Sequence, residues 1–134
     1  MREIKFRVFD QIKKTMNTVT SMWGFPEIET VCVPFEETVN TLFYSFELMQ
    51  FTGLKDKNGV HIYEGDIVKL SFNEYYSNEC VNVDEDTIVT GKITFEDGGY
   101  FINEKDSTWF YLYDMTDCAE IEIIGNIHEN PKLL

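Results

Sequence analysis

The chain has 134 residues, of which 43% are hydrophobic and 15% aromatic, and this composition is typical of one small globular domain with or without an appendage. It excludes a disordered chain, and no apolar run approaches the roughly 18 to 20 residues that span a bilayer. The net charge of −13 argues against direct binding to a phosphate backbone.

The N-terminal sequence mixes charged and apolar residues from its first positions, which is unlike a signal peptide. Cys32, Cys80 and Cys118 lie far apart and form neither a CxxC motif nor a Cys/His cluster. An odd number of separated cysteines fits free thiols in a reducing compartment. We therefore expect a soluble cytoplasmic protein with no membrane association and no cofactor.

Residues 1–52 are expected to form a β-rich N-terminal segment. Apolar residues alternate with polar ones in MREIKFRVFD, which predicts a strand, and residues 10–17 follow as a hairpin-like turn. The spacing within 35–42 fits a short helix or an irregular segment. A strand is predicted from about 43 to 52.

Residues 53–134 carry strong β signals. Tight turns are predicted at 55–59, where Asn58 precedes a glycine, at 64–66 and at 96–99. A polar, acidic insertion occupies 73–87. The strands expected between these segments are 67–72, 89–96, 100–102, 109–113 and 121–127. Five short strands with tight turns and few helix signals predict a small SH3-like β-barrel.

The stretch QFTGLKDKNGVHIYEGDIVKL, residues 50–70, is the most regular part of the chain. Gly59 and Gly65 are expected to supply positive φ or a close backbone approach, and Asp66 to bond its own downstream amides. We interpret the stretch as a structural turn motif, although a surface loop for a partner is the alternative. The residues of the motif are Gly53, Asn58, Gly59, Tyr63, Gly65 and Asp66.

No combination of residues predicts catalysis or metal binding. His61 and His128 have no nucleophile in an elbow motif beside them. The spacing of Asn82, Asp84 and Asp86 resembles the opening of a calcium loop, but a threonine replaces the expected glycine and an isoleucine the final glutamate. We therefore expect no enzyme, no catalytic residue and no metal site.

Negative charge is concentrated in the second half of the chain. Residues 1–72 carry 8 basic and 10 acidic side chains, whereas 73–134 carry 3 basic and 14 acidic ones. Such a field repels nucleic acid and attracts basic proteins. Asp84, Glu85 and Asp86 are the candidate acidic partner surface.

Trp109, Tyr111 and Tyr113 fall in a wholly apolar and aromatic run. Rings of this kind stack on nucleic-acid bases when lysines or arginines lie nearby, but here aspartates flank them. A strand that is apolar on both faces in a small barrel suggests that another subunit or the N-terminal segment covers one face. We therefore expect an interface with another protein and, as the preferred case, a homo-oligomer.

Three segments in the right order, QFTGLKDKNGVHIYEGDIVKL, GKITFEDGGYF and IEIIGNIHENPKLL, together with the opening REIKFRVFD, resemble the YopX family. The resemblance implies a phage or prophage protein in the bacterial host cell, rich in β-structure, with a small SH3-like barrel. It implies no catalytic residues, since the molecular function of that family is unassigned.

The preferred hypothesis is a non-enzymatic protein that works by interaction or self-assembly, with a phage or host protein as the partner if not a second copy. The alternative is an acidic decoy, resembling DNA in its charge, that binds a basic DNA-binding protein of the host. The alternative depends only on the negative charge of the second half.

Overall fold

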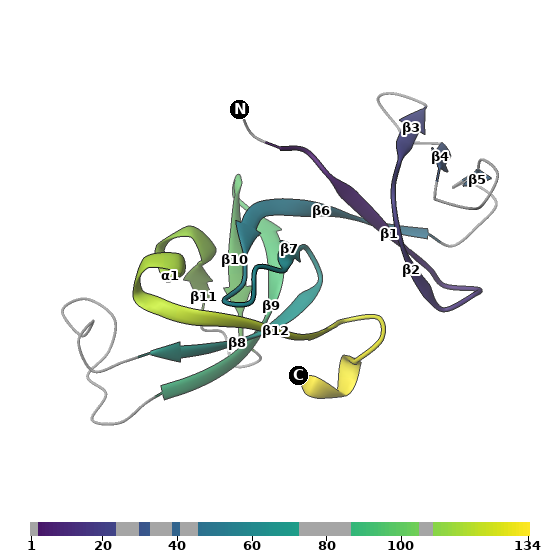
Figure 1. Ribbon diagram of the computed structural model, residues 1–134. Coiled ribbons are helices and arrows are strands. Elements are labelled where there is room, and N and C mark those ends of the chain that lie inside the picture. Colours follow the sequence, from purple (N-terminus) through teal and green to yellow (C-terminus); the bar gives the residue numbers. More distant parts are fainter. Residues whose placement is uncertain (1–2, 24–29, 33–38, 41–45, 73–86, 105–108) are drawn as a thin grey trace. The chain divides into compact units, whose positions relative to one another are not determined.

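The computed structural model describes residues 3–23, 30–32, 39–40, 46–72, 87–104 and 109–134 (Figure 1). The chain divides into two compact units, Met1–Phe51 and Thr52–Leu134. Most of the described residues lie in strands, with one short α-helix, so the expected mainly β fold is confirmed.

The first unit is built around a β-hairpin. Its strands are β1 (Phe6–Asp10), β2 (Thr15–Thr18), β3 (Ser21–Trp23), β4 (Thr30–Cys32), β5 (Val39–Asn40) and most of β6 (Phe46–Lys55). Strand β1 pairs with β2 on one side and β6 on the other, and β3, β4 and β5 form a separate small sheet. The alternation in β1 buries Val8 completely, against Val19, Phe46 and Leu48.

The β1–β2 turn forms where the sequence predicts it. One carboxylate oxygen of Asp10 accepts hydrogen bonds from the backbone amides of Ile12 and Lys13, both at 2.9 Å. Lys14 has a φ of 58° and completes the reversal. The helix considered for 35–42 is wrong at Val39–Asn40, which is a strand, and the rest of that range lies outside the described residues.

The second unit contains a curled antiparallel sheet. Its elements after β6 are β7 (His61–Tyr63), β8 (Asp66–Phe72), β9 (Thr87–Glu96), β10 (Gly99–Asn103), β11 (Trp109–Tyr111), α1 (Leu112–Cys118), β12 (Ala119–Asn126) and a 3₁₀ turn, η2 (Pro131–Leu133). Five strands pair in the order β11-β10-β9-β8-β12 and curl into a half-barrel (Figure 1). The SH3-like detail expected of this barrel stays a prediction.

The concave face of this sheet holds the core of the unit. Alternate residues of β8, β9 and β10 point inward, and α1 packs over β10, β11 and β12. The buried residues are Ile62, Val68, Leu70, Val89, Ile93, Tyr100, Ile102, Leu112, Met115 and Ile121. The β9–β10 hairpin has the expected two-residue turn, with φ of 47° at Asp97 and 83° at Gly98.

Helix α1 corrects the strand predicted over 109–113. The strand ends at Tyr111, and the helix begins at Leu112. Leu112 and Met115 are three positions apart, so a helix places both on one face, and both are buried in the core. Burial of this pair decides the conformation against the strand preference of the aromatic residues around it.

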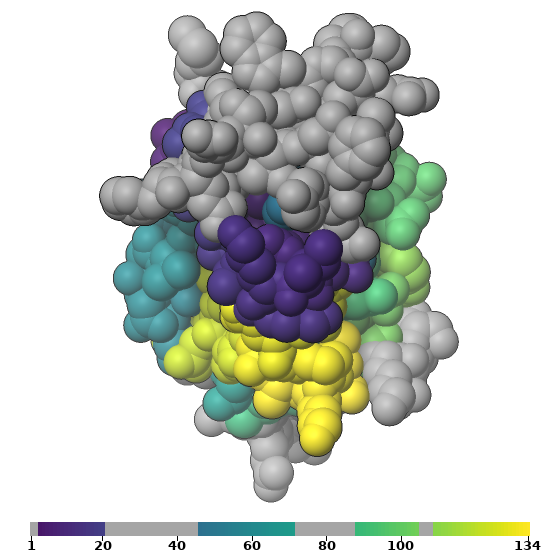
Figure 2. Space-filling model, turned by 90° about the vertical axis from the view of Figure 1, so that its right-hand side faces the viewer, coloured from purple at the N-terminus to yellow at the C-terminus, as the bar shows by residue number. Residues whose placement is uncertain are grey.

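Strands β8 and β9 stay paired as far as Phe72 and Thr87, so the predicted acidic insertion begins and ends at neighbouring strand ends. Apart from Thr87, that insertion lies outside the described residues. The turn η2 is exposed at the C-terminal end (yellow in Figure 2). Among the described residues, no helix has the length and hydropathy needed to cross a membrane.

Candidate functional site

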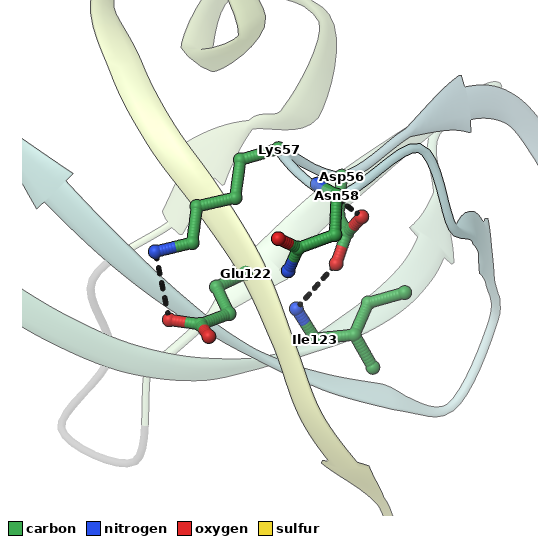
Figure 3. A network of polar contacts seen from close by, with 5 residues as sticks. All are labelled: Asp56, Lys57, Asn58, Glu122 and Ile123. Carbon is green, nitrogen blue, oxygen red and sulfur yellow. Dashed lines mark hydrogen bonds and ion pairs between the residues drawn. The ribbon is translucent and has the colours of Figure 1, made fainter.

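The first turn of the motif is organised by Asp56, a residue that the sequence placed in a turn without a role. One carboxylate oxygen, Oδ1, accepts hydrogen bonds from the amides of Asn58 and Val60, both at 2.9 Å. The other oxygen, Oδ2, accepts the amide of Ile123 in β12 at 3.2 Å (Figure 3). The side chain therefore closes its own turn and ties that turn to the last strand.

Lys57 strengthens the same tie from the neighbouring position. Its backbone amide donates to the carbonyl of Ile121 at 2.8 Å, and its ammonium group lies 3.1 Å from the carboxylate of Glu122 (Figure 3). Ile121, Glu122 and Ile123 are thus all held by two consecutive turn residues. The ion pair is half-exposed on both sides, so the backbone bond contributes more than the charges.

The charge state of Asp56 follows from these bonds. Burial raises the pKa of the carboxyl group, but the backbone amides of Val60, Ile123 and Asn58 stabilise its charged form and lower the pKa below the usual value of 3.8. Asp56 is therefore ionised near neutral pH and acts as an acceptor only.

The second turn of the motif places Gly65 between two strands. Its amide donates to the carbonyl of Ile93 at 2.9 Å, and its carbonyl accepts the amide of Ile127 at 2.9 Å. Gly65 has a φ of 77°, as expected. The carboxylate of Asp66 accepts the amide of Tyr63, three residues upstream, at 2.8 Å, and its expected bonds to downstream amides stay a prediction.

The remaining residues of the motif shape the backbone or lie at its surface. Gly53 in β6 and Gly59 in the first turn have φ of 90° and 80°, a region that favours glycine. Tyr63 is half-buried, and Asn58 is exposed. The motif brings together backbone amides and carboxylates that hold strands. Its contacts are accounted for by that task.

Three aromatic rings gather on the convex face of the second unit. Phe101 of β10 pairs with Tyr111 of β11, and Trp109 is two positions away on the same face. The ring of Phe101 lies 5.4 Å from that of Tyr111 and 6.0 Å from that of Trp109, centroid to centroid. We call Phe101, Trp109 and Tyr111 the aromatic strip.

The aromatic strip is accessible. Trp109 is 46% exposed and Tyr111 43% exposed. A Cβ atom at Gly99 would lie 2.8 Å from Cε2 of Tyr111, so the tyrosine ring rests on bare glycine backbone. One face of the ring is therefore packed against backbone, and its other face is left to solvent.

Charged residues of β9 stand on the same convex face. The register pairs Glu96 with Gly99, Thr94 with Phe101 and Lys92 with Asn103. Val89 and Ile93 of β9 point into the core. Because side chains alternate along a strand, the even-numbered residues of β9 point outward. Glu96 therefore borders the Tyr111 end of the strip, and Lys92 borders the Trp109 end.

The comparisons with known proteins identify the family. The family model for YopX protein matches residues 5–134. The chain belongs to the YopX family. The crystal structure of protein EF1440 from Enterococcus faecalis is similar to it, with 28% sequence identity, a TM-score of 0.67, and coverage of 100% of this chain and 99% of that chain. No curated protein matches.

The residues predicted to form an interface in this YopX-family protein do not all lie together in the structure. Trp109 and Tyr111 lie together in the aromatic strip, whereas Tyr113 lies on α1 and is 62% exposed. Asp84, Glu85 and Asp86 lie outside the described residues, so the acidic partner surface stays a prediction. His61 and His128 belong to separate elements, β7 and the turn after β12.

Two groups of functional interest were missed by sequence reasoning in this YopX-family chain. Phe101 joins the strip only through the β10–β11 register, which no local pattern gives. Asp56 could have been suspected, because an aspartate two positions before Asn-Gly is able to accept turn amides. Its bond to Ile123 depends on the fold and could not have been foreseen.

Proposed function

We propose that this YopX-family protein is a non-enzymatic interaction module that assembles with a second copy of itself through the aromatic strip. The observation that carries the proposal is the grouping of three rings on one sheet face with two of them more than two-fifths exposed. Tryptophan and tyrosine are enriched where interfaces gain most of their binding energy.

The charges of the elements that carry and adjoin the strip favour a protein over a nucleic acid as the occupant. In the described residues from β9 to α1, Lys92 is the one basic side chain, against five acidic ones: Glu96, Asp97, Glu104, Asp114 and Asp117. A base-stacking platform needs neighbouring positive charge to hold the phosphates. This surface would repel them.

A second copy offers a surface of matching chemistry. The turn between β1 and β2 exposes Lys13 and Lys14 beside Ile12, which is 65% exposed. Two ammonium groups next to an apolar side chain complement aromatic rings next to carboxylates. Charge complementarity between the turn of one copy and the strip of another supports self-assembly over an unrelated partner.

The test is the mass of the protein in solution. Multi-angle light scattering at about 10 to 100 μM is expected to give a multiple of 15.7 kDa for the native chain and a monomer for Trp109→Ser/Tyr111→Ser. The matched control, Val60→Ser/Ile124→Ser, removes exposed apolar side chains elsewhere and should leave the assembly intact.

A native chain that is monomeric throughout this range would overturn the proposal. An assembly that survives the double serine variant would also overturn it, since the strip would then not be the interface. Circular dichroism of each variant verifies that the fold is retained.

A further inference from the structure

One end of the aromatic strip combines a ring, a bare stretch of backbone and a carboxylate. Glu96 and Gly99 are direct partners across the β9–β10 hairpin, and the ring of Tyr111 lies over Gly99. By the strand alternation, the side chain of Glu96 projects from the same face as that ring, at the strand position paired with Gly99. We call Glu96, Gly99 and Tyr111 the Glu96 corner.

The side chain of Glu96 is exposed, and the described residues provide its carboxylate with no ion pair or hydrogen bond. Lys92, four positions earlier on the same strand and face, likewise has no charged partner among them. The Cα atoms of the two residues lie about 13 Å apart at the usual strand rise. The two charges give the face a negative end at Tyr111 and a positive end at Trp109.

We infer that the Glu96 corner binds the cationic side chain of an arginine or lysine presented by the partner protein. A guanidinium or ammonium group is attracted to the face of an aromatic ring, and an adjacent carboxylate accepts its N–H groups. Glu96 is the strand partner of Gly99 and the Tyr111 ring packs on Gly99, so the two side chains come from neighbouring positions of one face and can serve one cation together.

Lys92 determines which end of the strip accepts a cation. A segment lying along the strip with a basic side chain at the Glu96 corner would meet Lys92 at its other end, where a second cation is repelled. The surface thus selects a cation at one place instead of attracting any basic chain. This separates the inference from a general effect of the acidic second unit.

The inference rests on the proposed function, because it names the group that the partner brings to the strip. In a second copy, Lys13 and Lys14 have this chemistry. The Glu96 corner is nevertheless testable without assembly, since a small cationic molecule can occupy it.

The experiment is an NMR titration of the native chain with N-acetylarginine amide, using the neutral N-acetylcitrulline amide as the matched ligand. We expect saturable shifts of the Gly99 amide with the arginine compound and none with the citrulline compound. Glu96→Gln is expected to weaken binding by about tenfold. Lys92→Gln, the matched control on the same face, should bind equally well or more tightly.

Gly99→Ala is the second variant, because it keeps every polar group and displaces the Tyr111 ring from its seat. It should also lose most of the binding. Equal shifts with the two ligands, the absence of any binding, or full binding by Glu96→Gln would overturn the inference.

The failures of the two proposals are distinguishable. A monomeric native chain that binds the arginine compound contradicts the self-assembly and leaves the Glu96 corner standing as a cation site. An assembly that requires Trp109 and Tyr111 but is unchanged in Glu96→Gln contradicts the cation site and leaves the self-assembly standing.

Discussion

Asp56 and Ile123 are joined by a hydrogen bond although they stand 67 positions apart in the chain. The bond connects the first turn of the second unit to its last strand, and Lys57 adds a backbone bond to Ile121 at the same place. The KDKNG turn therefore acts on the whole unit, because it fixes β12 to the residues that follow β6.

Replacement of Asp56 by alanine is expected to lower the free energy of unfolding by about 2 to 4 kcal/mol, because three backbone amides lose a charged acceptor. Urea denaturation followed by circular dichroism measures the change. Glu120→Ala is the matched control, since it removes an exposed carboxylate of β12 and should cost less than about 0.5 kcal/mol. Equal stability of Asp56→Ala and the native protein would contradict the tie.

The ion pair between Lys57 and Glu122 should matter much less than Asp56. Both side chains are more than one-third exposed, so solvent screens their attraction. A double-mutant cycle of Lys57→Met and Glu122→Gln is expected to give a coupling below about 1 kcal/mol. A larger coupling would mean that the pair is shielded in solution more than its exposure indicates.

Acid should remove the contribution of Asp56. Its pKa is lowered in the folded state, so its stabilisation is fully present above the unfolded value of about 3.9 and is lost as pH falls through the folded value. The stability difference between the native chain and Asp56→Ala should therefore be largest near pH 6 to 7 and shrink below about pH 4. A difference that is constant down to pH 2.5 would contradict this assignment.

Two glycines of the curled sheet are expected to respond differently to alanine. A Cβ atom at Gly91 would lie 2.8 Å from Cγ2 of Ile102 and 2.9 Å from the carbonyl oxygen of Asn103, and backbone cannot move aside easily. Gly91→Ala should cost about 1 to 3 kcal/mol by overpacking. Gly99→Ala should cost less, since it meets the movable ring of Tyr111. Thermal denaturation of both variants measures the contrast, and the reverse order would refute it.

The local part of the fold could be predicted from the sequence because turns and alternation are local properties. Gly59 and Gly65 have the positive φ expected of them, and the turn at Asp97 and Gly98 joins β9 to β10 as expected. The strand predicted over 43–52 extends in the structure to Lys55, because Gly53 lies within the strand and does not end it.

The long-range part could not be predicted, since it depends on which strands meet. The aromatic strip needs the register of β10 with β11, and the bond from Asp56 needs β12 beside the first turn. Helix α1 was mistaken for a strand because aromatic residues surround Leu112, and burial against the core, not local preference, decides its conformation.

The pairing of β12 with β8 has a consequence for biosynthesis. Ile121 and Ile123 complete the sheet against Leu70 and Val68, which leave the ribosome long before them. A nascent chain that has emerged only as far as α1 has an unpaired β8 edge and lacks one wall of its core. During synthesis the second unit therefore stays partly folded, with the β8 edge accessible to strands of other chains, until β12 has left the exit tunnel.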